Sequence, residues 1–273
     1  MSYTPKKKGG AMKIIKVAIL GGVLFLSCIS LHSVTIIGHR GASGYEPENT
    51  LSSFARAIEC GADMVEFDVW KCLSGEIVVF HDMRVDRLTD GTGCVELKTL
   101  DELKELVVLG SETIPTLIEV LDFIDRRVKV YIELKGLNVA EAVVQTIEHY
   151  VTKKQWQYDD FLVASFDHTQ LQEVKMRNNS IAVAAIVCGI PVKLGSFASD
   201  VNANIAVLDA ECITQRFVDD IHSRGILVYV YTVNNADDAA RLVACGIDGI
   251  VTDYPDYIRI SFSSKSDLFL SSS

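Results

Sequence analysis

From residue 34 onward, short runs rich in Val and Ile alternate with longer stretches in which apolar and polar positions mix. Runs that are apolar throughout are typical of strands in a parallel sheet that helices cover on both sides. The pattern predicts strands at 34–38, 64–69, 77–81, 128–134, 161–165, 182–187, 205–208, 227–232 and 249–252. This is one strand more than a closed (β/α)8 barrel needs.

Between most of these runs, apolar residues recur at helical spacing. In the first stretch, Leu51, Phe54 and Ile58 share one helix face, Thr50 can cap the helix, and Gly61 can end it. The same order of cap, apolar stripe and glycine recurs in the stretches that end at residues 225 and 246. Such repeated βα units favour an α/β fold of the (β/α)8 TIM barrel type over an open doubly wound sheet.

Two stretches depart from this repeat. Only residues 70–76 separate the second and third runs, which is too short for a helix, so a bare crossover or a hairpin joins them. Residues from about 84 to 113 contain a turn-like 90–93 and a capping box at 99–102, and we interpret them as a small insertion over the barrel mouth. The barrel is predicted to span 34–260, with a C-terminal tail at 261–273.

The first 31 residues are predicted to be a signal peptide or a membrane anchor. Lysines up to Lys16 precede a nearly unbroken apolar run at 17–31, which has the length of a signal-peptide core and is short for a membrane span. Export is the leading interpretation, and a retained anchor is the alternative. The segment Phe25–Cys28 also resembles a lipoprotein cleavage site, which would place a lipid on Cys28. Both Met1 and Met12 are candidate starts.

The composition fits one barrel-sized domain, since the 273 residues are 49% hydrophobic. The formal charge is −10, and the first 27 residues hold five lysines and no acid, so the remainder carries −15. This acidic body argues against a nucleic-acid partner, but a bound cation can still attract an anionic small molecule. No C-x-x-C pair is present, which disfavours zinc or thioredoxin-like chemistry, whereas a bridge between Cys72 and Cys94 stays open.

Charged residues gather at the predicted carboxyl ends of the strands, where barrels of this class carry their chemistry. They are His39, Arg40, Glu66, Asp68, His81, Glu133, Lys135 and Asp253. Glu66 and Asp68 point to the same side of a strand, and with Glu133 they can surround one hard cation such as Mg²⁺ or Ca²⁺. Alone, either histidine is more often structural, and Glu133 with Lys135 reads as an ordinary ion pair. Together they indicate one shared site, since unpaired buried charges are costly.

The chain resembles the glycerophosphodiester phosphodiesterase family in a series of motifs from about Thr35 to Tyr257. The motifs are His39-Arg40-Gly41, Pro47-Glu48-Asn49-Thr50, Glu66-Phe67-Asp68-Val69, His81-Asp82, Asp86-Arg87 with Asp90-Gly91-Thr92-Gly93, Ile114-Pro115-Thr116-Leu117, Ile132-Glu133-Leu134-Lys135, Thr232-Val233-Asn234 and Gly249-Ile250-Val251-Thr252-Asp253. One departure is Tyr231, which stands where the family commonly has Trp.

The resemblance implies a barrel related to phosphoinositide phospholipases C that uses one divalent cation, Mg²⁺ or Ca²⁺. It implies hydrolysis of a small glycerophosphodiester to glycerol 3-phosphate and an alcohol. By position, it makes Glu66, Asp68 and Glu133 metal ligands, His39 and His81 the acid/base pair, Arg40 and Lys135 phosphate-binding groups, and Tyr231 part of the substrate pocket. Two histidines can supply the two proton transfers that a phosphodiester needs. The alternatives are a lysophospholipase D or sphingomyelinase D-like enzyme on membrane lipid, and a non-catalytic surface protein.

Overall fold

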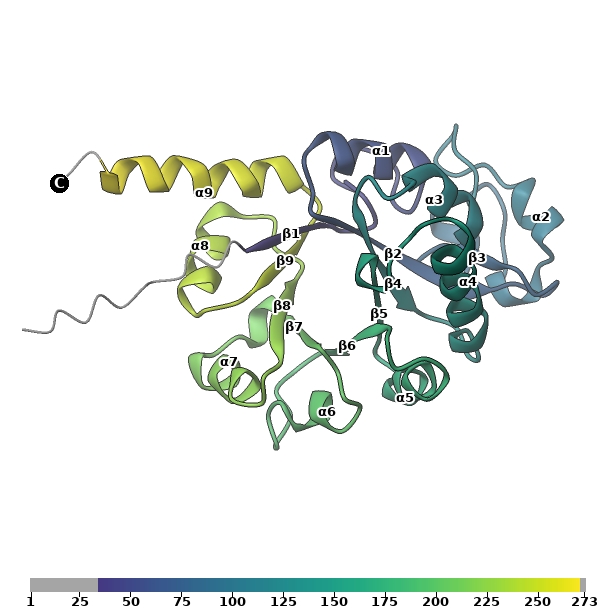
Figure 1. The fold of residues 1–273 in the computed structure, drawn as a ribbon. Helices are drawn as coiled ribbons and strands as arrows, with labels where there is room; N and C mark the ends of the chain where they lie inside the picture. Colours follow the sequence, from purple (N-terminus) through teal and green to yellow (C-terminus); the bar gives the residue numbers. More distant parts are fainter. Residues whose placement is uncertain (1–33, 271–273) are drawn as a thin grey trace, which may run out of the picture. The chain divides into compact units, whose positions relative to one another are not determined.

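Eight parallel strands close into a barrel with helices around its outside (Figure 1). The computed structural model describes residues 34–270. The barrel strands are β1 (Thr35–Gly38), β2 (Met64–Lys71), β4 (Lys129–Leu134), β5 (Phe161–Ser165), β6 (Ala182–Val187), β7 (Ile205–Asp209), β8 (Leu227–Tyr231) and β9 (Gly249–Thr252). β1 pairs in parallel with both β2 and β9, which closes the sheet. The predicted TIM barrel is confirmed.

The strands alternate with helices along most of the chain. The α-helices are α1 (Leu51–Glu59), α2 (Leu100–Lys104), α3 (Leu117–Ile124), α4 (Ala140–Lys153), α5 (His168–Arg177), α6 (Ser196–Ser199), α7 (Gln215–His222), α8 (Ala236–Ala244) and α9 (Pro255–Leu270). Short 3-10 helices are η1 (Val85–Arg87), η2 (Val95–Leu97), η3 (Tyr158–Asp160) and η4 (Ala210–Cys212). Across residues 34–270, no helix has both the length and the apolar character needed to cross a bilayer.

The helix boundaries follow from the capping residues. The side chain of Thr50 accepts a hydrogen bond from the backbone N–H of Ser53 at the start of α1, and Phe54 and Ala57 are buried on its inner face. Gly61 follows the helix with φ +74°, a conformation that glycine adopts without steric cost. The apolar stripe of α1 therefore packs against the barrel, as its spacing predicts.

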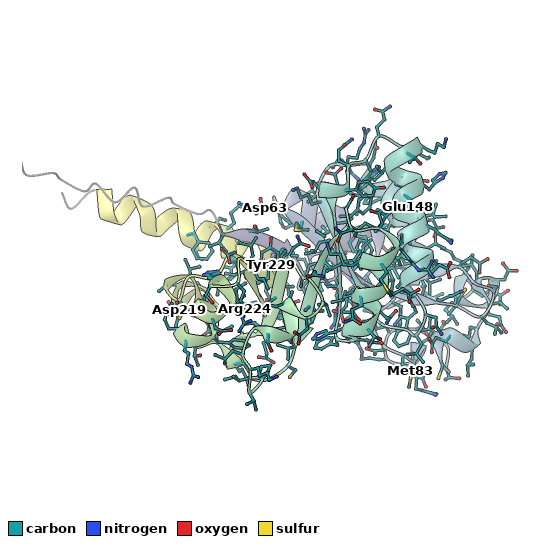
Figure 2. The ribbon with its side chains drawn as sticks, turned by 60° about the horizontal axis from the view of Figure 1, so that its bottom comes forward. Asp63, Met83, Glu148, Asp219, Arg224 and Tyr229 are labelled. Atoms are coloured by element: carbon teal, nitrogen blue, oxygen red, sulfur yellow. The ribbon has the colours of Figure 1, made fainter. Side chains whose placement is uncertain are left out.

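Apolar side chains fill both the barrel and the layer outside it. The interior cluster includes Ile37, Tyr131, Leu162 and Ile186, together with Tyr229, which lies among the strands (Figure 2). A larger cluster of buried side chains lies between strands and helices, and the removal of its apolar surface from water stabilises the fold. Because the interior is packed rather than open, the polar groups of the barrel gather at the ends of its strands.

The third predicted strand lies outside the barrel. β3 (Ile77–Val79) pairs antiparallel with β2, with Val79 opposite Val69 and Ile77 opposite Lys71. The hairpin alternative is therefore correct, and it accounts for the ninth strand. The insertion that follows has its own apolar cluster, which includes Val85 and Leu103.

Other sequence predictions have mixed outcomes. The capping box is confirmed, since Thr99 and Glu102 bond reciprocally at the start of α2. Cys72 and Cys94 are free thiols, so no bridge joins them. Helix α9 crosses the position at residue 260 where the sequence places the end of the barrel, and that domain boundary stays a prediction. The predicted signal or anchor, with Cys28, lies outside the described residues.

Candidate active site

Three carboxylates meet at the carboxyl ends of β2 and β4. Glu66 and Asp68 lie two residues apart on β2, and the strand register places Glu133 beside Asp68. One ligand oxygen from each residue lies within 4.8 Å of the others. Glu66 and Asp68 are only 3% and 1% exposed. A buried trio of carboxylates offers the oxygen donors that Mg²⁺ and Ca²⁺ prefer, so these residues fit a hard divalent cation.

Burial and the repulsion of neighbouring carboxylates raise the pKa values of Glu66 and Glu133. Desolvation, followed by the charges of Asp68 and Glu133, holds the pKa of Glu66 well above its ordinary range. Burial and the charge of Asp68 raise the pKa of Glu133 to about 7, although Lys135 opposes the shift. The trio therefore lacks enough positive charge nearby, and a divalent cation would supply it.

Two cationic side chains border the carboxylates. Arg40 donates its backbone N–H to Oε2 of Glu66 at 2.7 Å, and its Nε lies 3.6 Å from Oδ2 of Asp68. That buried Nε has no hydrogen-bond partner within residues 34–270. The ammonium of Lys135 lies 2.8 Å from Oε1 of Glu133 and 3.7 Å from Oδ1 of Asp68. Both cations therefore stand where they can contact an anion bound beside the carboxylates.

His39 and His81 are each paired with an aspartate. Nδ1 of His39 lies 2.6 Å from Oδ1 of Asp253, and Nδ1 of His81 lies 2.7 Å from Oδ1 of Asp82. A carboxylate at Nδ1 favours the tautomer that carries its proton there and leaves Nε2 as the acceptor. Burial lowers the pKa of His81, against the opposing charge of Asp68. The Nε2 atom of His81 lies 3.3 Å from the ammonium of Lys135.

The loop after β1 holds the side chains of Arg40 and Asp68 in place. Oε1 of Glu48 accepts a hydrogen bond from Nη1 of Arg40 at 2.7 Å. The side chain of Asn49 donates to Oδ2 of Asp68 and accepts from the Asp68 backbone N–H. Arg40 and Asn49 both have positive φ, at 51° and 60°. The Pro47–Thr50 motif thus braces the arginine and one carboxylate.

A small hollow lies between His39 and the carboxylates of Glu66 and Glu133. It has a volume of about 30 Å³ and is lined in part by His39, Glu133, Phe166 and Tyr231. The rings of Phe166 and Tyr231 meet edge to face with centroids 6.1 Å apart, and the Lys135 ammonium lies 5.8 Å from the Phe166 centroid. The hydroxyl of Tyr231 donates to a backbone carbonyl on β6, so its ring forms a fixed wall.

The profile of the glycerophosphoryl diester phosphodiesterase family matches residues 39–257, which include every residue of this site. The chain belongs to this family. It is therefore a phosphoric diester hydrolase by descent, on a barrel of the family's type. The family resemblance read from the sequence is confirmed.

Individual members of the glycerophosphoryl diester phosphodiesterase family are similar to this chain over most of their length. A glycerophosphodiester phosphodiesterase of Caldanaerobacter subterraneus is 33% identical, with 81% of this chain and 94% of that protein aligned. One of Bacillus subtilis is 30% identical, covering 84% and 86%. An Oleispira antarctica phosphodiesterase, whose structure is solved in complex with the product sn-glycerol-3-phosphate, is 31% identical with a TM-score of 0.77, and the match covers 84% of this chain and 96% of that one.

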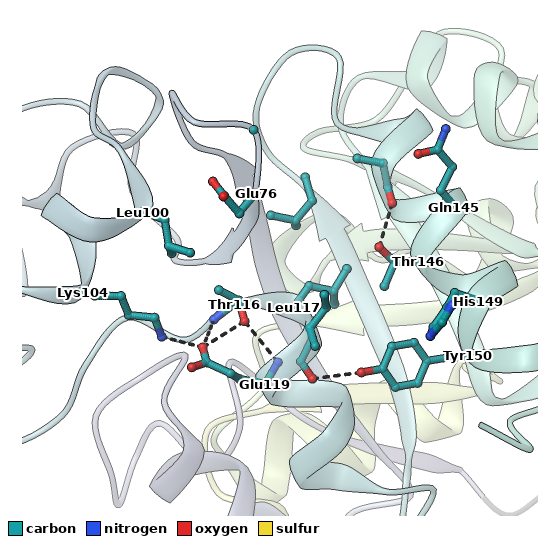
Figure 3. A pocket seen from close by; sticks show the side chains of 14 residues that line it. Glu76, Leu100, Lys104, Thr116, Leu117, Glu119, Gln145, Thr146, His149 and Tyr150 are labelled. Carbon is teal, nitrogen blue, oxygen red and sulfur yellow. Dashed lines mark hydrogen bonds and ion pairs between the residues drawn. The ribbon is translucent and has the colours of Figure 1, made fainter. Parts of the chain in front are cut away.

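A larger groove of about 650 Å³ lies away from this site (Figure 3). It runs between the β3 hairpin, α2, α3 and α4 on the outside of the barrel. Its walls include an ion pair between Lys104 and Glu119 and the ring of Tyr150, whose hydroxyl donates to the Ile118 carbonyl. None of the two histidines and three carboxylates of the site lines this groove, so the larger cavity is not the candidate active site.

The structure brings together all eight residues that the sequence selects for the site. They are His39, Arg40, Glu66, Asp68, His81, Glu133, Lys135 and Tyr231. From the sequence, Asp253 is placed at the shared strand edge without a specific role, and Asp82 and Phe166 receive no role. The position of Asp253 at the end of the last strand was the available signal, because barrel closure brings that end beside His39. The phosphodiesterase family motif at Asp86-Arg87 also received no role.

Proposed function

We propose that this protein hydrolyses glycerophosphodiesters to glycerol 3-phosphate and an alcohol, with one bound Mg²⁺ or Ca²⁺. The observation that carries the proposal is the meeting of two aspartate-held histidines with a buried carboxylate trio at one strand edge. Membership of the phosphodiesterase family supports it, as does the similarity to a phosphodiesterase solved with sn-glycerol-3-phosphate.

The two histidines account for the proton transfers. The glycerol hydroxyl next to the phosphate loses its proton to Nε2 of one histidine, and its oxygen bonds to phosphorus. The bond from phosphorus to the leaving oxygen breaks, and the other histidine gives that oxygen a proton, so a cyclic phosphate and a free alcohol result. Water then opens the ring with the roles of the histidines reversed. His39 and His81 are the residues we assign to these steps.

The negative charge on the phosphoryl oxygens needs fixed positive partners. Arg40 offers a buried Nε–H without a hydrogen-bond partner in the described chain, and Lys135 offers an ammonium on the same side. When bound to Glu66, Asp68 and Glu133, the divalent cation supplies further positive charge at this point. Tyr231 and Phe166 bound the space beside it.

The test is release of glycerol 3-phosphate from glycerophosphocholine by the purified full chain with Mg²⁺, with Ca²⁺ and with a chelator. We expect turnover that the chelator abolishes and that His39→Ala or His81→Ala reduces by at least about 100-fold. His149→Ala, an exposed histidine on α4, is the matched control and should keep wild-type turnover. Absence of turnover from folded protein under every condition would refute the proposal. Metal-dependent turnover would in turn exclude the non-catalytic scaffold.

A lysophospholipid is the second candidate substrate, and the apolar rim of the barrel mouth favours it. The loops after β3, β4, β5 and β6 each expose at least one large apolar side chain, and five such side chains are from 47% to 101% exposed. These are Met83 (Figure 2), Leu137, Phe166, Ile190 and Val192. Exposed apolar side chains on neighbouring loops suit contact with a lipid surface, and Phe166 connects this rim to the site. A sphingomyelinase D-like activity would use the same rim.

We also propose that the first 31 residues direct export, either as a cleaved signal or as a tether, with Cys28 as the lipid-bearing residue in the second case. The basic start and apolar run support this. The mass of the N-terminal peptide from the mature chain tests it. A peptide that begins at an acylated Cys28 indicates a lipoprotein, and an intact apolar run indicates an anchor. An unprocessed chain recovered from the cytoplasm would refute export.

A further inference from the structure

The side chain of Arg87 joins the insertion to the catalytic end of the barrel. Its Nε donates to Oδ2 of Asp82 at 2.6 Å, and its Nη2 donates to Oδ1 of Asp82 at 3.0 Å. Its Nη2 also donates to Oε1 of Glu48 at 2.8 Å, and its Nη1 donates to Oε2 at 3.1 Å. The guanidinium of Arg87 therefore forms hydrogen bonds to both oxygens of each of two carboxylates. Such bidentate contacts are the strongest that arginine makes with a carboxylate.

Both carboxylates hold a residue of the proposed machinery on their other side. Asp82 contacts Nδ1 of His81, and Glu48 accepts from Nη1 of Arg40. The contacts form a continuous chain from the histidine through Arg87 to the phosphate-binding arginine. No backbone segment shorter than forty residues makes the same connection, since His81 and Arg40 leave different strands. The guanidinium of Arg87 thus links the two residues on the side away from the carboxylate trio, in addition to the longer contacts that run through Lys135 and Asp68.

The segment that carries Arg87 is anchored independently of the site. η1 rests on the buried side chain of Val85, whose backbone N–H donates to the Gly93 carbonyl at 3.0 Å. The side chain of Asp86 accepts from the Gly93 backbone N–H at 2.9 Å. The turn-like Asp90–Gly93 segment therefore closes a small loop that presents Arg87 towards Asp82. This gives the Asp86-Arg87 motif a structural reason.

The hydrogen bonds to Asp82 and Glu48 leave Arg87 one N–H for any other partner. A guanidinium has five N–H donors. Four hydrogen bonds to Asp82 and Glu48 engage Arg87. Removal of the guanidinium would leave two neighbouring carboxylates facing each other without a cation, and their repulsion would move Asp82 away from His81.

We propose that Arg87 is a positioning residue, which holds Asp82 and Glu48 so that His81 and Arg40 face the same phosphate. The role rests on the proposed function. Hydrogen bonding from Arg87 is also the largest cause that lowers the pKa of Asp82, to about 2. The Asp82 carboxylate beside His81 is therefore ionised at neutral pH.

The kinetic test compares Arg87→Ala with Arg84→Ala in the full chain. Arg84 is similarly exposed and lies in the same segment, and within residues 34–270 its side chain pairs with Asp86 and the Cys94 thiol and with no residue of the site. We expect Arg87→Ala to lower kcat for glycerophosphocholine by about 10- to 100-fold, with partial rescue by added guanidinium ion and little rescue by methylammonium. Arg84→Ala should keep wild-type kcat and show no rescue. A rise in KM at unchanged kcat would instead indicate direct substrate binding and overturn the proposal.

A second measurement needs no turnover, so that failure of the proposed function is told apart from failure of this inference. In protein labelled with ¹⁵N-histidine, the Nδ1 and Nε2 resonances of His81 are assigned with His81→Gln. We expect them to shift in Arg87→Ala and to stay in place in Arg84→Ala. Unchanged His81 resonances in Arg87→Ala would overturn the positioning role, whereas absent wild-type turnover with shifted resonances would refute only the proposed reaction. Arg87→Lys, which keeps the charge but not the fork, should show an intermediate shift.

Discussion

Nδ1 of His39 lies 2.6 Å from Oδ1 of Asp253, although 214 positions separate the two residues in the chain. The contact exists because β1 and β9 are neighbours, with Gly38 beside Thr252, so the first and last strands bring their ends together. Burial opposes ionisation of Asp253, but hydrogen bonds, that of His39 first among them, lower its pKa to about 2. A permanently ionised carboxylate therefore sets the imidazole tautomer.

Asp253→Asn should lower kcat by about 100-fold or more while the fold is kept. The amide cannot stabilise a protonated His39, and it can donate to Nδ1 and so favour the wrong tautomer. The measurement is kcat for glycerol 3-phosphate release, with thermal unfolding as a check on folding. Asp256→Asn is the control, because Asp256 lies nearby on α9 and contacts Tyr45 rather than a histidine. Equal losses in both variants would contradict the assignment.

The sequence predicts that the candidate site residues lie close together because they stand at the ends of strands. In a closed parallel barrel, the carboxyl ends meet by geometry, so Glu66, Asp68 and Glu133 could be brought together without coordinates. Strand existence was equally accessible, since Val- and Ile-rich runs mark buried strands. The sequence could not place β3, because a short link permits either a hairpin or a crossover. Only the antiparallel pairing of β3 with β2 in the structure decides between them.

The links between site residues could not be read from the sequence. Arg87 reaches Glu48 across 39 positions, and the contact depends on how the insertion folds around its own apolar cluster. The partner of His39 depends on barrel closure. The local spacing of residues predicts the cap at Thr50 and the glycine that ends the helix. It contains no information on the contact between Arg87 and Glu48 or on that between His39 and Asp253. Side-chain networks between distant loops are therefore what the structure adds.

Metal removal should make stability depend on pH in a specific direction. Without a cation, the pKa of Glu133 is about 7 in the folded protein against an ordinary value of 4.5. A raised carboxyl pKa stabilises the folded state at low pH, and that stabilisation is lost as pH rises from about 4.5 through 7. The free energy of unfolding should therefore fall by about 2–3 kcal/mol between pH 5 and pH 8 in chelator.

Denaturant unfolding at pH 5 and pH 8, with chelator and with Mg²⁺ or Ca²⁺, measures this effect. The cation should restore stability mainly at pH 8, because it displaces the proton from the carboxylates. Glu133→Gln removes the titrating group and is the control, so its pH dependence in chelator should be smaller. A wild-type protein that is more stable at pH 8 than at pH 5 in chelator would contradict the prediction.

Gly41 should tolerate no side chain. Its φ is +90°, and an added Cβ would approach the carbonyl carbon of Ser53 to 2.6 Å and the Ser53 hydroxyl still more closely. Gly75 has a similar φ of +107°, but an added Cβ there meets nothing within 4 Å. We expect Gly41→Ala to lower the free energy of unfolding by about 3 kcal/mol or more, and Gly75→Ala by about 1 kcal/mol. Equal losses would show that backbone conformation alone decides the cost.

The apolar rim gives a way to decide between soluble diesters and lipid substrates. Val192 is fully exposed on the loop after β6, and it takes no part in the carboxylate and histidine cluster. A charge there should not disturb a small substrate, but it should oppose insertion into a lipid surface, where burial of an ionised group is costly. Met176 is 79% exposed at the end of α5, away from the strand ends, and serves as the matched position.

We expect Val192→Asp to leave hydrolysis of glycerophosphocholine unchanged and to lower hydrolysis of lysophosphatidylcholine in phosphatidylcholine vesicles by about tenfold. Met176→Asp should change neither rate. Because all variants keep the same N-terminal segment, any contribution of that segment to vesicle binding cancels in the comparison. Loss of both activities in Val192→Asp would indicate a disturbed site. Equal vesicle rates in the two variants would show that the rim has no role in presenting lipid to His39 and His81, whereas the absence of vesicle hydrolysis by the wild-type protein would leave water-soluble glycerophosphodiesters as the substrates.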